Sequence, residues 1–315
     1  MPETLATAAH VDVTPLAGHV GAQISGVDTG VPVSDDAVAK IREALLDYKV
    51  VFLRGQSLNY RRQVAFAERL GPLTLGHPTL ASPPGQPLLE EIDSRKGGKV
   101  NYWHTDVTFV DRPPAFTVLH AVVIPPIGGD TIWANTVSAY QSLPADLREL
   151  ADRLRVLHTN DYDYARTFSR GEQVDPATAA AHAEFVSTVY ETEHPLVRVH
   201  PETSERSLVL GGFARTVLGF TPQASRDLIR LLQEYITRPE QTVRWRWRED
   251  DLAIWDNRAT QHYAIADYGT AHRRGERVTV AGPIPVGVDG RPSVAIKGNA
   301  SAYYAGSAGH EPAAS

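Results

Sequence analysis

Two side chains that can bind a metal ion lie two residues apart in the run Asn101-Tyr102-Trp103-His104-Thr105-Asp106. Where the chain is extended, this spacing puts His104 and Asp106 on the same face of a strand. A single distant histidine would then complete a set of two imidazoles and one carboxylate around a metal ion. Such a set would leave coordination positions open for a substrate and O₂. The question is whether the rest of the chain supplies that histidine and a site for a co-substrate.

The composition restricts which side chains can hold a metal. The 315-residue chain has no cysteine, which excludes disulfides, iron–sulfur clusters, zinc fingers and thiol nucleophiles. Because the chain has twelve histidines, one His-x-Asp pair could arise by chance. Most of the other histidines lack a paired ligand pattern or lie near the chain ends: His10, His158, His182, His194, His200 and His310. The run Glu193-His194-Pro195 suggests a turn.

A candidate for the third ligand lies far along the chain. The run Trp255-Asp256-Asn257-Arg258-Ala259-Thr260-Gln261-His262 places His262 just beyond a predicted strand, at a turn rich in polar side chains. Sites are commonly built on such strand-end loops. Trp103 and Phe109 flank the first pair and could exclude water from a reactive metal.

Several helices are predicted from caps and apolar periodicity. Ser34 can cap a helix that ends near Tyr48, and apolar residues recur along it at helical spacing. Thr221 followed by Pro222 starts another helix, with an apolar face from Leu228 to Ile236. Two further helices are expected over about 60–70 and 142–154, the first of which stops at Gly71.

The strand predictions decide the fold class. Apolar and β-branched runs predict strands at 50–53, 115–123, 252–255 and 278–281. The alternating run 243–248 predicts a strand with tryptophans on one face and arginines on the other, which favours a half-buried strand over a nucleic-acid-binding strip. Because the second half lacks a βαβ alternation, we expect a mainly β fold, an antiparallel sandwich or barrel with helices added outside.

Three runs resemble the motifs of the taurine dioxygenase (TauD/TfdA) family of Fe(II)- and 2-oxoglutarate-dependent oxygenases. They occur in the family's order, at family-like separations: Trp103–Phe109, Gly128–Trp133 and Trp255–His262. The resemblance extends from about Leu16 to Pro283. Three other runs are most similar to alkylsulfatase-type members: Gly76–Pro78, His158–Tyr164 and Arg198–Thr203.

The resemblance implies a double-stranded β-helix, or jelly roll, and identifies residues for the iron and the co-substrate. It makes His104, Asp106 and His262 the Fe(II) ligands. The family places an arginine for the far carboxylate of 2-oxoglutarate eleven residues after the second histidine, which here is Arg273. The hydroxyl group that binds this carboxylate together with the arginine in the family corresponds to Thr131. Arg274 is the neighbouring candidate if the register differs by one residue.

The same resemblance indicates an anionic substrate. In relatives that oxidise sulfates and sulfonates, the substrate anion is bound at the positions of Arg277 and His77. Further expected substrate contacts are Asn101, Phe109 and Phe213. The chain departs from relatives at Gly275-Glu276, where a Met-His pair is usual, and it differs over Ala81–Lys99. A substrate carboxylate would satisfy Arg277 as well as a sulfate or sulfonate.

The implied reaction is oxidation of an unactivated C–H bond of a small anionic molecule, with release of succinate and CO₂ from 2-oxoglutarate and O₂. The alternatives are a tailoring oxygenase in antibiotic or terpenoid biosynthesis, as in pentalenolactone-type pathways, and a non-catalytic binding protein on the same fold. The altered Gly275-Glu276 favours the tailoring enzyme. A zinc hydrolase with the same ligands would need neither Arg273 nor Thr131.

Bulk properties limit the partners. The net charge of −6 argues against a nucleic-acid-binding body, and no apolar run is long enough to span a membrane. The start of the chain lacks the pattern of a signal peptide, so a cytoplasmic enzyme is expected. We expect one oxygenase domain over 11–300, a lid or insertion near 160–193, mobile tails at 1–10 and 305–315, and a homo-oligomer, dimer or tetramer.

Overall fold

A computed structural model describes residues 10–97, 100–161 and 176–306. Its largest sheet has seven strands in the order β1-β2-β3-β13-β5-β15-β4. Neighbouring strands are antiparallel except β2 and β3, which are parallel. The bounds are β1 Asp12–Pro15, β2 Ala22–Ser25, β3 Val50–Leu53, β4 Leu89–Asp93, β5 Phe116–Val123, β13 Leu252–Asp256 and β15 Arg274–Val280.

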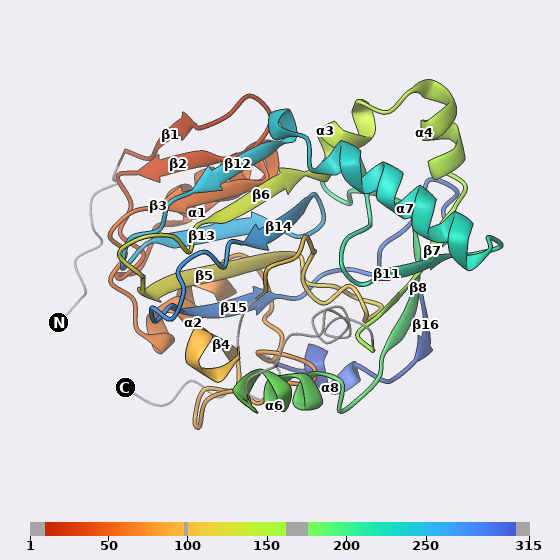
Figure 1. The fold of residues 1–315 in the computed structure, drawn as a ribbon. Coiled ribbons are helices and arrows are strands. Elements are labelled where there is room, and N and C mark those ends of the chain that lie inside the picture. The colour runs from red at the N-terminus through yellow and green to blue at the C-terminus, as the bar shows by residue number, and fades with distance from the viewer. Residues whose placement is uncertain (1–9, 98–99, 162–175, 307–315) are drawn as a thin grey trace.

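Smaller antiparallel sheets complete the described β structure (Figure 1). The first has the order β12-β6-β14, the second β11-β7-β8-β16, and β10 pairs with β9. Their bounds are β6 Thr131–Asn135, β7 Arg155–Thr159, β8 Glu191–Pro195, β9 Val197–Val199, β10 Arg206–Leu208, β11 Ala214–Val217, β12 Thr242–Trp245, β14 Thr260–Ala264 and β16 Val294–Lys297.

Alternating side chains of the large sheet enter two different cores. On β3, Val51 and Leu53 join the core beneath the first two helices, whereas Val50 and Phe52 join the core shared with the β12-β6-β14 sheet. The same division holds on β13 and β5. Because both faces of the sheet are covered, these strands are apolar throughout, which explains the continuous apolar run at 50–53.

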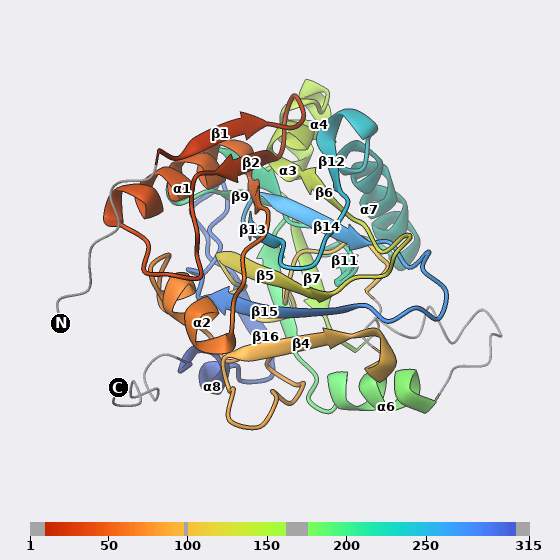
Figure 2. The same cartoon turned by 90° about the vertical axis from the view of Figure 1, so that its left-hand side faces the viewer.

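The helices lie outside the β structure, on opposite sides in Figure 2. α1 (Asp35–Tyr48) and α2 (Tyr60–Glu68) cover the outer face of the large sheet, and α7 (Pro222–Ile236) packs with α3 (Thr136–Gln141) against the β11 side. Ser34 and Thr221 cap α1 and α7, as predicted. The remaining described helices are α4 Ala145–Ala151, α6 Pro176–Phe185, α8 Ser301–Tyr304 and the short 3₁₀ turns η1 Ser94–Lys96 and η2 Pro239–Gln241.

The mainly β class is confirmed, and the alternating run 243–248 behaves as predicted. Val243, Trp245 and Trp247 are buried, and the intervening arginines are exposed. Only the part up to Trp245 is a regular strand. The strand expected at 278–281 begins earlier, at Arg274, because pairing with β4 and β5 on both sides supplies hydrogen bonds that local sequence does not reveal.

Two local predictions were wrong. The helix expected over 142–154 is shorter and corresponds to α4 alone, Ala145–Ala151, because Pro144 cannot donate a backbone hydrogen bond and instead precedes its first turn. α3 ends before this range, at Gln141, and was not predicted. The run Glu193-His194-Pro195 is not a turn but the end of β8. Its pairing with β7 buries His194 completely.

The predicted lid near 160–193 lies partly outside the described residues, which resume at Pro176 with α6 and continue into β8. Most of the predicted tails also lie outside them. Among the described helices, none combines the length and the apolar character that crossing a membrane requires.

Candidate metal and co-substrate site

His104, Asp106 and His262 meet at one buried point. The Nε2 atoms of His104 and His262 each lie 3.7 Å from Asp106 Oδ1, and one ligand atom from each residue lies within 4.8 Å of the others. His104 and His262 exchange two backbone hydrogen bonds of 3.0 and 2.8 Å. The structure therefore brings the three residues together, as the sequence predicted, although His104 and His262 are 158 positions apart in the chain.

The local backbone differs from the expected one. His104 forms an isolated bridge with His262, and Asp106 lies in a turn rather than on a regular strand. Val107 adopts a left-handed φ of 54°, which turns the chain directly after the aspartate. His262 lies within β14 and not just beyond a strand. His104 and Asp106 therefore point to the same site because a bridge at His104 is followed by a turn at Asp106, and not because both lie on one face of a strand.

A hydrogen-bond network orients Asp106. Thr117 on β5 donates a 2.8 Å bond to Asp106 Oδ2, and Asn257 donates a 2.8 Å bond to the Thr117 hydroxyl. The Asn257 carbonyl oxygen accepts from the Trp255 indole, at 3.0 Å, and from the Asp106 backbone, at 3.4 Å. Such support around ligands fixes their orientation. Sequence reasoning missed Thr117, and Asn257 was visible only as part of a motif.

The protonation of the three groups suits a divalent metal. His104 Nδ1 lies 3.0 Å from the Tyr102 carbonyl oxygen and donates its hydrogen to it. The other ring nitrogen, Nε2, therefore keeps a free lone pair that can bind a metal. Burial lowers the pKa of both His104 and His262. Burial opposes ionisation of Asp106, but Arg277 and the two histidines keep its pKa below the usual value. Two neutral imidazoles and one carboxylate fit Fe(II).

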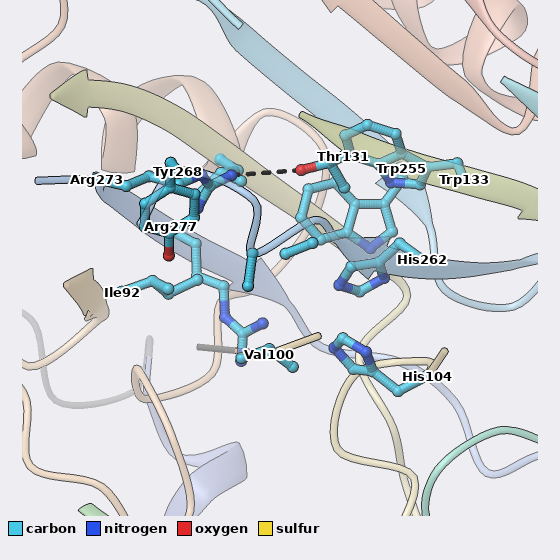
Figure 3. A pocket seen from close by; sticks show the side chains of 13 residues that line it. Ile92, Val100, His104, Thr131, Trp133, Trp255, His262, Tyr268, Arg273 and Arg277 are labelled. Atoms are coloured by element: carbon cyan, nitrogen blue, oxygen red, sulfur yellow. Dashed lines mark hydrogen bonds between the residues drawn. The ribbon is translucent and has the colours of Figure 1, made fainter. Parts of the chain in front are cut away.

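Arg273 and Thr131 form the far end of a pocket that opens onto the two histidines (Figure 3). Arg273 donates 3.0 Å and 3.3 Å hydrogen bonds to the Gly129 carbonyl and the Thr131 hydroxyl. The Trp247 indole also donates to this hydroxyl, at 2.9 Å, so its own hydrogen is free to donate. Apolar and aromatic side chains line the walls between the ends, including Ile92, Leu119, Trp133, Trp255 and Tyr268.

The Arg273 guanidinium has no carboxylate partner among the described residues. The adjacent Asp130 pairs instead with Arg244, at 2.7 Å, and burial lowers the pKa of Arg273. A buried cation without a counter-ion is costly and favours an anionic ligand. Arg274, the alternative in register, pairs with Glu276.

Arg277 lies within β15, four residues after Arg273, and has two carboxylate partners. Its Nη1 lies 2.5 Å from Asp106 Oδ1, and its Nε and Nη2 lie 2.8 and 2.6 Å from Glu90 Oε2. Although burial lowers the pKa of Arg277, these carboxylates raise it above the usual value. Figure 3 shows this side chain extending toward His104. Sequence reasoning missed Glu90.

Glu276, which departs from the family pattern, does not face the site. Successive residues of β15 alternate between the sheet faces, so Glu276 and Arg277 point in opposite directions. The Glu276 carboxylate pairs with Arg274, and its backbone carbonyl accepts a 2.9 Å bond from Gln63 of α2. The glutamate that contacts Arg277 is therefore Glu90 and not Glu276.

His77 is buried close to Arg277 and next to an aromatic cluster. Its Nδ1 accepts hydrogen bonds from the backbone of Thr79 and Leu80, at 3.1 and 3.0 Å, which leaves Nε2 protonated. Burial, followed by the nearby Arg277, lowers the pKa of His77 to about 3. It is therefore a neutral hydrogen-bond donor.

The remaining predicted substrate residues divide into two groups. The rings of Phe109 and Phe213 pack edge-on with centroids 5.0 Å apart, and the Phe213 centroid lies 6.2 Å from that of His104. Phe185, at the end of α6, joins them and lies 5.6 Å from His77. Asn101 is exposed and lines a wide groove beside α7 instead of the pocket between the histidines and Arg273.

Comparisons with known proteins agree with this geometry. The family profile described as "Taurine catabolism dioxygenase TauD, TfdA family" matches residues 12–279. The chain is 50% identical over 292 residues to an α-ketoglutarate-dependent sulfate ester dioxygenase of Pseudomonas putida, covering 91% of this chain and 96% of that protein. It is 47% identical over 277 residues to an alkylsulfatase of Acinetobacter baylyi, covering 87% and 86%.

A solved structure supports the fold. A taurine dioxygenase from Burkholderia xenovorans superposes with a TM-score of 0.78 at 41% identity, covering 94% of this chain and 98% of that one. The fold and site thus define a jelly-roll oxygenase that uses 2-oxoglutarate. The chain belongs to the TauD/TfdA family of 2-oxoglutarate-dependent dioxygenases.

Proposed function

We propose that this protein is an Fe(II)- and 2-oxoglutarate-dependent dioxygenase that oxidises the carbon next to a sulfate ester oxygen. The observation that carries the first part is a buried His–Asp–His triangle beside Arg273, a buried arginine with no carboxylate partner in the described structure. The sulfate ester is supported by relatives that are 50% and 47% identical over most of this chain.

The donor set assigns a role to each residue. His104, Asp106 and His262 would hold Fe(II), which supplies the oxidising chemistry when bound with 2-oxoglutarate and O₂. Arg273 and Thr131 bind the far carboxylate of 2-oxoglutarate, since a guanidinium and a hydroxyl can each donate to it. The apolar walls between Arg273 and the histidines exclude water from the co-substrate.

The substrate is proposed to lie beside the metal ligands at Arg277 and His77, apart from the far carboxylate of 2-oxoglutarate at Arg273. Arg277 and the Nε2–H of His77 bind its anionic head group, and the Phe109–Phe213 cluster packs against its alkyl chain. Hydroxylation of the carbon that bears the sulfate gives a hemiacetal-like ester, which collapses to an aldehyde and sulfate. 2-Oxoglutarate and O₂ are converted to succinate and CO₂, with the second oxygen atom entering the substrate. No protein group needs to act as a general base.

An anaerobic titration tests the metal and co-substrate assignment. Fe(II) plus 2-oxoglutarate should produce a visible metal-to-ligand charge-transfer band. The variant His104→Ala should abolish it and reduce turnover at least about 1000-fold, because two ligands hold the metal poorly. His200→Ala is the matched control, since His200 is also a buried histidine paired with an aspartate but is not one of the three candidate ligands and does not line the pocket. A band that survives in His104→Ala would reject the assignment.

A substrate panel tests the sulfate ester. Linear alkyl sulfates, alkyl sulfonates and alkyl carboxylates of equal chain length should be compared by 2-oxoglutarate-dependent sulfate, sulfite and succinate release. Sulfate release from the alkyl sulfates is expected. Turnover of carboxylates without sulfate release would overturn the proposal in favour of a tailoring oxygenase, including one of antibiotic biosynthesis.

We further propose a single oxygenase unit over 11–300 and a cytoplasmic homo-oligomer without a nucleic-acid partner. The lack of cysteine supports a reducing compartment, and the net charge of −6 argues against binding to nucleic acids. Light scattering of the purified protein would give the oligomeric state.

A further inference from the structure

Glu90 contacts Arg277, the cation that binds the substrate anion in the proposed function. Both Arg277 contacts fall on one oxygen of its carboxylate, Oε2, through Nε and Nη2. Its side chain is about nine-tenths buried, at 11% exposure. The guanidinium that is to receive the head group therefore already has a buried counter-ion that is not a metal ligand.

We propose that Glu90 is a specificity-determining residue that neutralises Arg277 and so weakens the attraction of the head-group site for anions. The inference depends on the proposed function of Arg277 and His77. When Asp106 binds a metal, Glu90 remains as the counter-ion of Arg277. The head group then meets a neutral Arg–Glu pair and a neutral His77 instead of an uncompensated cation.

Strand register places Glu90 there. β4 pairs antiparallel with β15 so that Glu90 lies directly opposite Arg277 and Glu91 lies opposite Glu276. Facing residues of paired strands share one face of the sheet, so Glu90 and Arg277 both point inward. Glu91 points outward and pairs with Lys96. Two adjacent glutamates thus have opposite environments.

The residues around Glu90 and Arg277 bury this ion pair, so it is not a solvent-exposed surface pair. Leu88 and Leu89 precede Glu90 and are fully buried. Gly76 approaches β4 so closely that a Cβ would lie 2.3 Å from the Leu89 carbonyl oxygen, and this approach brings the His77 segment against Glu90's strand. Burial raises the pKa of Glu90, and Arg277 opposes that rise. Charges in such a site are weakly screened by solvent.

The consequence is a graded response to ligand charge. An anionic head group is attracted by Arg277 and repelled by Glu90, so removing the Glu90 charge should strengthen binding. The gain should be larger for a dianion than for a monoanion, because the repulsion scales with the ligand charge. A carboxylate that merely held Arg277 in place would give the opposite result, weaker binding for both.

The test compares Glu90→Gln with Glu91→Gln in the full-length protein loaded anaerobically with Fe(II) and 2-oxoglutarate. Glutamine keeps an oxygen that accepts from Arg277 and removes the charge. Calorimetry should measure the affinities for n-hexyl sulfate and n-hexyl phosphate at pH 8, where the phosphate carries about two charges. Glu90→Gln should bind the sulfate about ten-fold more tightly and the phosphate more tightly still, whereas Glu91→Gln should change both less than about two-fold.

Other outcomes also decide the question. Unchanged or weaker binding in Glu90→Gln, or equal gains for both ligands, would overturn the proposal. Glu90→Met is a second variant with the same expected direction, should the glutamine variant fold poorly. If the wild-type protein releases no sulfate, the proposed function fails, but the same comparison with n-hexanoate still measures the effect of Glu90. The 2-oxoglutarate affinity, which depends on Arg273, should stay constant in every variant.

Discussion

Arg273 and Arg277 are four residues apart, both are buried, and both enter the space around the proposed metal ligands, yet their guanidinium groups have different partners. Arg273 contacts a carbonyl and a hydroxyl. Arg277 contacts the carboxylates of Glu90 and Asp106. As a result burial lowers the pKa of Arg273, whereas two carboxylates raise that of Arg277. The same residue type thus lacks a carboxylate partner in one case and is half of a buried ion pair in the other, although both arginines are proposed to bind an anion.

The neighbouring strands cause this difference. Arg273 precedes β15 and lies next to the Gly129 turn, where a Cβ on Gly129 would lie 3.1 Å from Arg273 Cδ. That close approach leaves no room for an acidic side chain at this position. Arg277 lies farther along, where β4 is paired with β15 and supplies Glu90. Cross-strand neighbours therefore decide which arginine has a buried counter-ion.

The largest expected effect concerns the stability of the metal-free protein. Arg277→Leu should lower the free energy of unfolding by about 3 kcal/mol, because it leaves the buried carboxylates of Glu90 and Asp106 without their cation. Arg273→Leu should cost about 1 kcal/mol, since only neutral acceptors lose a partner. Urea unfolding at equilibrium measures both. The double variant Glu90→Leu/Arg277→Leu should regain only the part of the loss that comes from Glu90, because Asp106 stays without Arg277. Equal losses in the two single variants would contradict the distinction between the arginines.

The next effect concerns 2-oxoglutarate. Arg273→Ala should raise its dissociation constant about 100-fold, because a charged hydrogen-bonded pair with the far carboxylate is lost. Arg274→Ala is the matched control, as Arg274 pairs with Glu276 and does not line the pocket, and it should change the constant less than about two-fold. Anaerobic titration of the charge-transfer band gives both values. A larger effect of Arg274→Ala than of Arg273→Ala would show that Arg274, one residue later, binds the far carboxylate of 2-oxoglutarate.

Thr131→Val should have a smaller effect on the same constant. Valine has nearly the shape of threonine but lacks the hydroxyl that donates to the carboxylate, so 2-oxoglutarate should bind about five-fold more weakly, equivalent to about 1 kcal/mol. The affinity for an alkyl sulfate should not change. Loss of sulfate binding instead would show that Thr131 belongs to the Arg277 side of the site.

The smallest effect concerns pH. An ordinary histidine, with a pKa of about 6.5, would gain positive charge between pH 7.5 and 6 and would bind sulfate more tightly as the pH falls. The pKa of His77 is lowered to about 3, so this residue stays neutral over that range. Alkyl sulfate affinity of the loaded enzyme should therefore vary less than about two-fold. A rise that disappears in His77→Gln would show that His77 titrates there.

Local sequence was informative where local physics determines the structure. The caps at Ser34 and Thr221 and the apolar runs at 50–53 and 252–255 were placed correctly. The same reasoning started a helix at 142, ahead of Pro144, and took the end of β8 for a turn. Those errors arise where long-range pairing or a single missing donor outweighs local preference.

The sequence by itself determined the mainly β class and the family, and it predicted the metal ligands, because histidine, aspartate and arginine at fixed separations form the family's motifs. It also predicted Arg273 and Arg277 as the two anion-binding cations. Only the tertiary structure decided that Asp106 is reached through a bridge and a turn, that Glu276 faces outward, and that Glu90 neutralises Arg277. The physical reason is strand register: a shift of one residue would exchange Glu90 for Glu91 at the head-group site, and nothing in the run Leu88-Leu89-Glu90-Glu91 specifies that register locally.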